Sequence, residues 1–325
     1  MVTDLATRAE LVKLARALGT TDDEVAFAAV LPHEDIRRVR ERAVATLYDE
    51  HRAAYQRVAA LTRVLPTSVN VRIALRAFPP LLAARVAGEM TPDRAAELAD
   101  RMPVDYLAEA CVHLDPRRAP PLIRRIHPKR VLNVVAELID RGEFITLGRL
   151  LDAATEHVIH DVAASVSSET LLRIGVYAES GTQLTRAVAL LPPARLRDVI
   201  HDALTGPPEL AAAGLALLGR LTDNTLRGRL SNHAAEANDP TLTRLLRTAV
   251  TEDAVPALLT AVAAMNEDAQ RRVLRLPALA DPEMVDQLIM AVEKHNLWQT
   301  MNGLTDLMEG EVRQQFVTAC RGRPR

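Results

Sequence analysis

Apolar residues recur along this chain at helical spacing, in short runs that proline interrupts. No stretch alternates apolar and polar residues with turn residues around it, as a strand would. From residue 66 onward, prolines 66, 79, 92, 103, 116 and 128 follow one another at steps of 11–13 residues. Proline is tolerated in the first helical turn and discourages helix at the residue before it. Each of these prolines is therefore predicted to end one helix and begin the next.

Side chains that cap helices precede several prolines. Thr91-Pro92, Asp115-Pro116, Asp239-Pro240 and Asp281-Pro282 each place a capping oxygen before a proline at the first helical position. After residue 128 the prolines become sparser, but Gly, Asn, Ser and Asp continue to interrupt the apolar pattern at intervals of 11–25 residues. The whole chain is predicted to be helical, with no strand.

Helices this short are marginally stable alone and must stack on their neighbours. Repeated helix pairs that bury one continuous core form a curved array. The predicted fold is an all-α solenoid of the HEAT or armadillo type, built from short helix pairs. We divide it into N-terminal helices over residues 1–65, helical repeats over 66–141, and further repeats over 142–325 that continue the first array.

Residues 33–65 differ from the repeats, because they contain no internal proline or glycine. Their apolar positions keep a spacing near 3.6, interrupted at Glu50, and predict one long helix over the whole segment. Two roles are open for this helix. It packs against the first repeats, as most amphipathic helices do, or it projects and mediates a homodimer. The first role is favoured.

The segment TPDRAAELADRMPVDYLAEACVHLDPRRAPPLIRRI, residues 91–126, resembles a repeat of the N-terminal cytosolic domain of the MgtE magnesium transporters, and the resemblance extends over roughly residues 78–140. That repeat is similar in turn to the armadillo-like repeats of flagellar motor switch proteins. The matching positions are Pro92, Ala95, Leu98, Pro103, Leu107, Leu114, Asp115, Pro116, Ala119 and Leu122.

The resemblance implies a right-handed superhelix of short helices and nothing catalytic. In the transporters the domain senses Mg²⁺ through surface acids that face a pair of CBS domains, ahead of a membrane channel. This sequence shows neither a CBS pair nor a membrane span, so no magnesium site is carried over. What the resemblance leaves is the expectation of a regulatory or docking module.

Composition fits this fold and narrows the compartment. Hydrophobic residues make up 48% of the chain but aromatic residues only 3%, so Leu, Ala and Val must supply the packing. The two cysteines, Cys111 and Cys320, are too far apart in the sequence to suggest a metal knuckle or a disulfide framework. No uncharged apolar run approaches the 18 or so residues needed to span a bilayer. We expect a cytoplasmic protein without membrane insertion.

Charge is distributed unevenly despite the formal net charge of −2. Residues 1–130 carry a net charge of +4, and the remainder carries −6. Two segments, between Glu50 and Glu89 and between Asp115 and Glu137, contain Arg and Lys but no acid. They predict a basic surface made of Arg72, Arg76, Arg85, Arg117, Arg118, Arg124, Arg125, Lys129 and Arg130. Such a surface attracts phosphates or an acidic protein. The alternative, that these are only solvated helix faces, is favoured on general grounds.

Residues with catalytic or metal-binding chemistry are few. His157, His160 and Asp161 lie within about one helical turn and form a weak metal candidate, but two histidines do not make a site. Cys111 shares an apolar helix face with Leu107 and predicts a buried thiol rather than a nucleophile. No Gly-rich phosphate loop, nucleophile elbow or kinase signature occurs. We expect no enzymatic activity, no catalytic residue and no cofactor.

Three functions from different classes remain open. The leading hypothesis is a non-enzymatic scaffold or regulatory module that binds an acidic protein or peptide along the array, because solenoids present long concave surfaces. The second is nucleic-acid binding through the Arg groups, which is less favoured because aromatic residues for base stacking are scarce nearby. The third is small-molecule binding or catalysis in a pocket between helices.

Overall fold

The computed structural model describes residues 4–308 and 310–321. Over these residues the chain forms 23 α-helices and three short 3-10 helices and no strand, which confirms the all-α prediction. The chain divides into two compact units. The N-terminal unit comprises residues 9–170 and 177–183, and the C-terminal unit comprises residues 4–8, 171–176 and 184 onward. The proposed segment boundary at residue 142 stays a prediction.

The helices of the N-terminal unit are mostly short. Their bounds are α1 Leu5–Leu18, α2 Asp22–Val25, η1 Ala26–Val30, α3 His33–Asp49, α4 Arg52–Leu61, α5 Thr67–Ala77, α6 Pro80–Ala87, α7 Pro92–Ala99, α8 Val104–His113, α9 Ala119–Ile123, α10 Pro128–Asp140, α11 Phe144–Arg149, η2 Leu151–Ala153 and α12 Glu156–Ser165. Helices α13, Ser168–Val176, and α14, Gly181–Ala189, each run from one unit into the other.

The prolines begin helices as predicted. Helices α5, α6, α7, α8 and α10 each start at one of the predicted prolines or at the residue after it. Pro116 lies in the turn before α9, three residues ahead of the helix itself. The proline spacing thus gave the lengths of the helices between residues 66 and 140.

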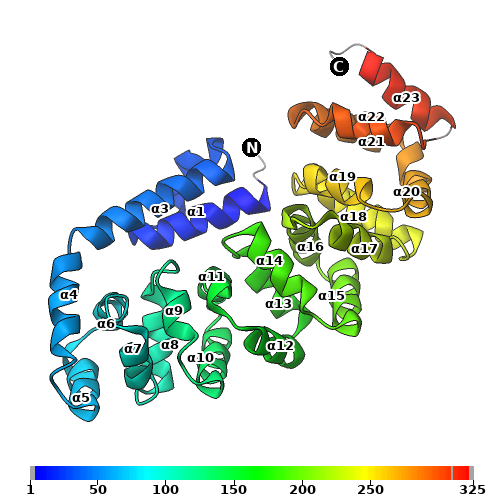
Figure 1. Ribbon diagram of the computed structural model, residues 1–325. Helices are drawn as coiled ribbons and strands as arrows, with labels where there is room; N and C mark the ends of the chain where they lie inside the picture. The colour runs from blue at the N-terminus through cyan, green and yellow to red at the C-terminus, as the bar shows by residue number, and fades with distance from the viewer. Residues whose placement is uncertain (1–3, 309, 322–325) are drawn as a thin grey trace. The chain divides into compact units, whose positions relative to one another are not determined.

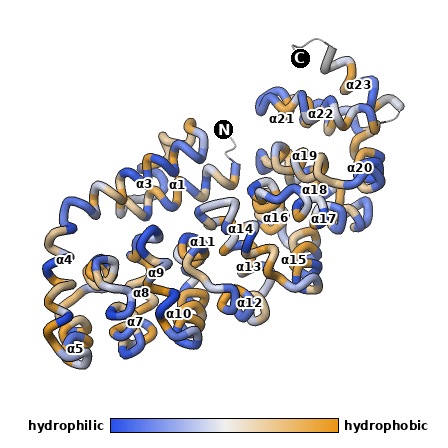
Figure 2. Tube along the Cα trace, in the orientation of Figure 1, coloured by the Kyte–Doolittle hydropathy of each residue, from blue (hydrophilic) through white to orange (hydrophobic). Residues whose placement is uncertain are grey.

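The helices α4 to α12 of the N-terminal unit pack in two rows (Figure 1). One row places α4, α6, α8, α10 and α12 beside one another in that order, and the other places α5, α7, α9 and η2 beside one another. Most of these helices are amphipathic, as the alternation of hydrophobic and hydrophilic stretches in Figure 2 shows. The space between the two rows is therefore where their apolar side chains meet.

The prediction of one helix over residues 33–65 is wrong. Helix α3 ends at Asp49 and α4 begins at Arg52, because the backbone leaves helical geometry at His51 (φ −111°, ψ 7°). The two halves serve different cores. Ile36 of α3 packs in a cluster with Leu14 of α1 and Val25 of α2, whereas α4 packs against α6. The bend at His51, directly after the interruption of the apolar spacing at Glu50, lets each half bury its own apolar side.

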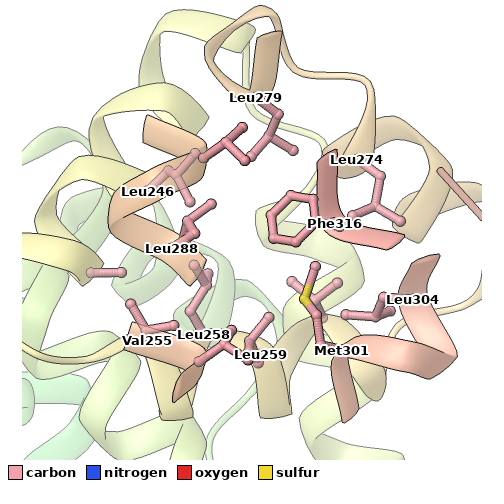
Figure 3. Close-up of a cluster of buried hydrophobic side chains, with 14 of the residues drawn as sticks. Leu246, Val255, Leu258, Leu259, Leu274, Leu279, Leu288, Met301, Leu304 and Phe316 are labelled. Carbon is pink, nitrogen blue, oxygen red and sulfur yellow. The ribbon is translucent and has the colours of Figure 1, made fainter. Parts of the chain in front are cut away.

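The C-terminal unit contains longer helices. Their bounds are α15 Pro193–Thr205, α16 Pro208–Arg220, α17 Asn224–Ala234, α18 Asp239–Thr251, α19 Val255–Ala263, α20 Glu267–Leu274, η3 Pro277–Ala280, α21 Pro282–Lys294, α22 Trp298–Thr305 and α23 Gly310–Arg321. Its main core is one cluster of 17 buried side chains that runs from α16 to α23. Figure 3 shows Leu288, Met301 and Phe316 pointing toward a shared centre of this cluster.

Helix caps agree with the sequence at two of four positions. Asp281 caps α21 by accepting a hydrogen bond from the Glu283 amide, and Thr91 occupies the cap position of α7 without a side-chain bond. At α18 the cap is Asn238 rather than the predicted Asp239, one residue earlier. Asp115 accepts from the Arg117 amide in a turn ahead of α9 rather than in the helix. Asn and Asp cap equally well, so the adjacent pair was ambiguous.

Candidate functional site

The N-terminal unit contains an apolar cavity between the two helix rows. Its volume is about 250 Å³, and all six helices from α4 to α9 contribute to its wall. The wall contains no charged side chain. It is lined by Val58, Leu61, Thr62, Leu65, Asn70, Ile73, Ala74, Phe78, Ala83, Ala84, Val86, Ala87, Met90, Ala95, Leu98, Ala99, Met102, Tyr106, Leu107, Ala110, Cys111, Leu114, Leu122, Ile123 and Ile126.

The cavity exists because alanine occupies many positions where the rows face each other. Seven of the lining residues are alanines, drawn from α5, α6, α7 and α8. An alanine satisfies the apolar pattern and favours helix, yet its methyl group leaves space that a leucine would fill. The sequence therefore makes the rows pack without filling the volume between them.

The polar groups of the cavity wall are all used within the chain. The Thr62 hydroxyl, the Asn70 amide and the Tyr106 hydroxyl each donate to main-chain carbonyl oxygens, at 2.7, 2.9 and 3.0 Å. These bonds satisfy groups that would otherwise be costly to bury. The Thr62, Asn70 and Tyr106 side chains therefore use their donor hydrogens within the chain.

Cys111 lies in this wall, as its position on an apolar face led us to expect. Burial raises the pKa of the Cys111 thiol to about 12. The thiol therefore stays protonated at neutral pH and is a poor nucleophile. This agrees with the prediction of a packing role for the residue.

The cavity opens to solvent at the end formed by α4 and α5. Among its lining residues, Leu61, Leu65 and Ile73 are exposed by 63%, 39% and 40%. Four exposed arginines occur in the same stretch of chain, Arg57, Arg63, Arg72 and Arg76. In the described part of the chain, none of the four has an ion-pair partner. We call the exposed side chains of residues 57–76 the α4–α5 surface.

Arg85 and Arg118, two members of the predicted basic surface, lie over the ring of Tyr48. Their guanidinium carbons are 5.2 and 4.3 Å from the ring centroid, within cation–π range. The Tyr48 hydroxyl donates to Glu89 at 2.9 Å, and Glu89 also pairs with Arg118 at 2.6 Å and Arg52 at 3.2 Å. Burial and the bond to Glu89 raise the pKa of Tyr48. These arginines are engaged inside the unit.

Arg117 is engaged as well. It forms a two-point ion pair with the buried Asp115, with nitrogen–oxygen distances of 3.0 and 2.7 Å. Burial alone would raise the pKa of Asp115, but the hydrogen bonds and charge of Arg117 lower it. Both residues belong to the segment that resembles the transporter repeat. In this structure the hydrogen bonds between Asp115 and Arg117 close the turn ahead of α9.

The remaining predicted basic residues lie at separate places on the rows. Arg72 and Arg76 are exposed on α5, and Lys129 is exposed on α10, which belongs to the other row. Arg124 is exposed at the end of α9, beside Arg125, which pairs with Asp93 at 3.3 Å. Arg130 is half-buried and donates to the Ala99 carbonyl at 3.4 Å. The structure thus brings the set together only in part, with α5 and α9 in one row on either side of α7.

A buried ion cluster connects distant parts of the N-terminal unit, and sequence analysis did not find it. Glu179, in the turn before α14, lies 2.6 Å from Arg40 of α3, 3.4 Å from Arg149 of α11 and 3.8 Å from Lys13 of α1. Glu10 of α1 lies 2.7 Å from Lys13 and 3.1 Å from Arg40. The five side chains are exposed by only 1–13%.

The cluster holds three cations and two carboxylates. Burial alone would raise the pKa of Glu179, but the charges of Lys13, Arg40 and Arg149 outweigh burial and lower it. A signal was available on α1, where the charged Glu10 and Lys13 fall between the buried Ala9 and Leu14. Charged residues on the apolar side of a helix indicate a buried ion pair.

The weak metal candidate lies on α12, where His157 and His160 are exposed by 65% and 60%. Asp161 is 3.3 Å from His157 and 3.7 Å from His160. Within residues 4–308 and 310–321, no group of three or more His, Cys, Asp or Glu residues is arranged to hold a metal ion. The three side chains form an exposed polar patch on the helix.

The chain matches no family model, no curated protein and no solved structure. Across the part of the chain that the structure describes, no helix combines the length and the apolar character needed to cross a membrane. The features that bear on function are therefore the α4–α5 surface, the apolar cavity and the buried ion cluster.

Proposed function

We propose that this chain is a non-enzymatic helical-repeat module that binds an acidic protein or peptide through the α4–α5 surface. The observation that carries the proposal is a concentration of exposed large apolar side chains. Among the described residues, 14 such side chains are exposed, and six of them fall between residues 61 and 75, within the α4–α5 surface. Exposed apolar patches of this kind mark interaction sites.

The charges around these side chains indicate the chemistry of the partner. Val69 and Ile73 are exposed on α5 at a spacing of four residues, and Arg72 and Arg76 repeat the same spacing beside them. Residues three or four apart share one side of a helix, so apolar and cationic groups alternate around one face. A complementary partner segment presents apolar side chains flanked by Asp and Glu.

The arrangement of helices supports the module class. The two rows of α4 to α12 are the packing expected of an α-solenoid of the HEAT or armadillo type, and the resemblance to the MgtE N-terminal repeats points to a right-handed superhelix. Solenoids act through their surfaces rather than through a catalytic centre. We place the module in the cytoplasm, where its thiol remains reduced.

The experiment is affinity capture of the tagged full chain from its own cell lysate, with and without nuclease, at low and moderate salt. Three proteins are compared, namely the wild type, the Arg72→Glu/Arg76→Glu variant and an Arg229→Glu control. Arg229 is an exposed arginine on α17 of the C-terminal unit. We expect a discrete acidic partner that wild type and control retain and that the double variant loses.

Three other results would overturn the proposal. Equal capture by all three proteins would show that the α4–α5 surface is not the contact. Material that disappears with nuclease would favour nucleic-acid binding, for which the exposed arginines are the supporting observation, and its affinity would fall steeply with salt. Recovery of the chain alone as a dimer would favour self-association.

A further inference from the structure

The apolar cavity is large enough to hold a ligand. An engineered apolar cavity of about 150 Å³ is sufficient to bind benzene, and the cavity between α4 and α9 measures about 250 Å³. Nothing in the proposed docking of a protein at the α4–α5 surface requires such a volume behind it. This inference therefore goes beyond the proposed function and stands without it.

The chemistry of the cavity wall determines which part of a ligand can be buried there. The wall contains no charged group, and the side-chain hydrogen bonds of Thr62, Asn70 and Tyr106 are already made to backbone carbonyls. A carboxylate or another acceptor carried into the cavity would lose its water without gaining a donor from these side chains. The anionic end of a ligand is therefore excluded from the cavity, and the buried part is an apolar chain.

The shape of the cavity favours a chain over a compact ring system. Lining residues come from α4, α6 and α8, three neighbouring helices of one row, and from α5, α7 and α9 of the other. Packed helices lie about 8–10 Å apart, so two steps along the row extend the cavity over roughly 16–20 Å. A volume of about 250 Å³ spread over that length is narrow. An extended alkyl chain suits these proportions.

The charges beside the cavity opening determine which charge the head group of the ligand should carry. Leu61, Leu65 and Ile73 mark the opening, and the exposed Arg63, Arg72 and Arg76 are near neighbours of these three in the sequence. No acid occurs between Glu50 and Glu89 in the sequence. Glu97, which accepts from the Thr67 hydroxyl at this surface, is paired with Arg94 at 2.6 Å. An alkyl chain that enters here leaves its polar end near Arg63, Arg72 and Arg76, and an anionic end is stabilised there.

We propose that the cavity between the α4–α6–α8 and α5–α7–α9 rows binds the alkyl chain of a fatty-acid-like anion, whose head group lies at Arg63, Arg72 and Arg76. The bound molecule fills the volume that the alanines leave open. Because it binds the folded chain, it also stabilises the N-terminal unit.

The first experiment is calorimetric titration of the full chain with laurate below its micellar concentration, alongside decanoate and dodecyltrimethylammonium. We expect one laurate per chain. Decanoate should bind roughly tenfold more weakly, because two fewer methylenes enter the cavity. The cationic amphiphile has the same chain with the opposite head charge and should bind more weakly than laurate. Equal binding of laurate and the cationic amphiphile would overturn the assignment of the head group.

Variants separate the cavity from the surface. Ala110→Leu places a larger side chain in the cavity, and Arg72→Glu/Arg76→Glu reverses charge at the opening. Each should weaken laurate binding roughly tenfold or more, while Arg229→Glu in the C-terminal unit leaves it unchanged. The effect of Ala110→Leu is the decisive one, because Ala110 lies in the cavity wall on α8 and outside the α4–α5 surface.

The outcomes that overturn the proposal are distinct from those that test partner capture. If laurate does not bind, or binds equally to wild type and Ala110→Leu, the cavity does not hold the chain. Cosedimentation with phosphatidylglycerol vesicles in the absence of laurate binding would assign the arginines to a membrane surface instead. Circular dichroism of Ala110→Leu confirms that loss of binding is not loss of the fold. Should that variant not fold, the less bulky Ala87→Val repeats the test on α6.

Discussion

The two units bury their side chains in different ways. The C-terminal unit has one continuous core of 17 residues, most of them Leu, Val or Met, closed by Phe316, which is fully buried. In the N-terminal unit, two clusters contain five buried residues each, one around Ile36 and one around Leu122. Beside them lie an apolar cavity of about 250 Å³ and a buried ion cluster.

This difference shows where each unit obtains its stability. Contiguous apolar packing joins most helices of the C-terminal unit between α16 and α23. The N-terminal unit leaves apolar volume unfilled and joins α1, α3 and α11 through charges, which must be paired to be tolerated in the interior. Proteins give up packing of this kind mostly at functional sites. The comparison therefore points to the N-terminal unit as the functional one, and four sets of substitutions test it.

The largest effect is expected in the ion cluster. Glu179→Gln keeps the shape of the side chain but leaves Lys13, Arg40 and Arg149 facing one another without that carboxylate. The N-terminal unit should lose roughly 3–5 kcal/mol of unfolding free energy, as when one partner of a buried pair is removed. Urea unfolding followed by circular dichroism measures the loss.

A matched control for this change is Glu252→Gln in the C-terminal unit. Glu252 pairs with Arg8, whose side chain is 46% exposed. Exposed ion pairs contribute roughly 0–1 kcal/mol. If Glu179→Gln costs no more than Glu252→Gln, the buried charges do not join the helices of the N-terminal unit.

Removing leucine side chains compares the two interiors directly. Leu288, 6% exposed, is in full contact with the continuous core, and Leu288→Ala should cost roughly 2–5 kcal/mol. Leu107 lines the cavity and is only partly buried, so it has fewer packed neighbours to lose. Leu107→Ala should cost roughly 1–2 kcal/mol. Equal losses in urea unfolding would mean that the cavity wall is as well packed as the core.

Helix starts were predictable because their causes are local. Proline, Asp and Asn act on the residues next to them, so the starts of α5, α6, α7, α8 and α10 followed from the proline spacing, whereas α9 begins three residues after Pro116. The break between α3 and α4 at His51 was only partly predictable from the sequence. The apolar spacing is interrupted at Glu50, but no proline or glycine accompanies it, and the bend arises because α3 and α4 pack in different places.

The ion cluster and the cavity depend on packing between distant segments. Glu179 lies 139 residues from Arg40 along the chain, so nothing in the sequence near either residue indicates the pairing. The basic residues illustrate the same limit. Arg72 and Arg118 occur in similar acid-free segments, yet Arg72 is exposed and Arg118 lies over the Tyr48 ring. The sequence shows where charged residues occur along the chain, but it does not show which of them are exposed on the surface.

Smaller changes in stability, of opposite sign, are expected when two alanines of α8 are replaced by leucine. Ala110 lines the cavity, whereas Ala108 is fully buried and lies outside its wall. Ala110→Leu fills open volume and should stabilise the N-terminal unit by about 1 kcal/mol. Ala108→Leu overpacks a filled position and should destabilise it by roughly 1–3 kcal/mol. Thermal unfolding of both variants decides the matter, and destabilisation by both would show that the volume cannot accept a side chain.

The smallest effect is expected at Asp253, which follows α18 in the C-terminal unit. Its carboxylate lies 2.6 Å from Lys294 and 2.8 Å from His295, and its backbone is left-handed with φ 55°. Asn tolerates that conformation, so Asp253→Asn removes charge without adding backbone strain. Because Lys294 is about half exposed and water can replace part of its interaction with Asp253, the loss near neutral pH should be only about 1 kcal/mol.

The pH dependence of this loss identifies its cause. Burial alone would raise the pKa of Asp253, but its bonds to Lys294 and His295 lower it in the folded state. A carboxyl whose pKa is lowered by folding adds stability above its unfolded value, and that stability disappears as the pH falls through the folded value. The difference between wild type and Asp253→Asn should therefore decline toward zero below the ordinary Asp pKa of about 4. A difference that persists at acid pH would mean that geometry rather than charge holds this turn. The loss at Asp253 would then not measure how much charge pairing contributes to the stability of the C-terminal unit.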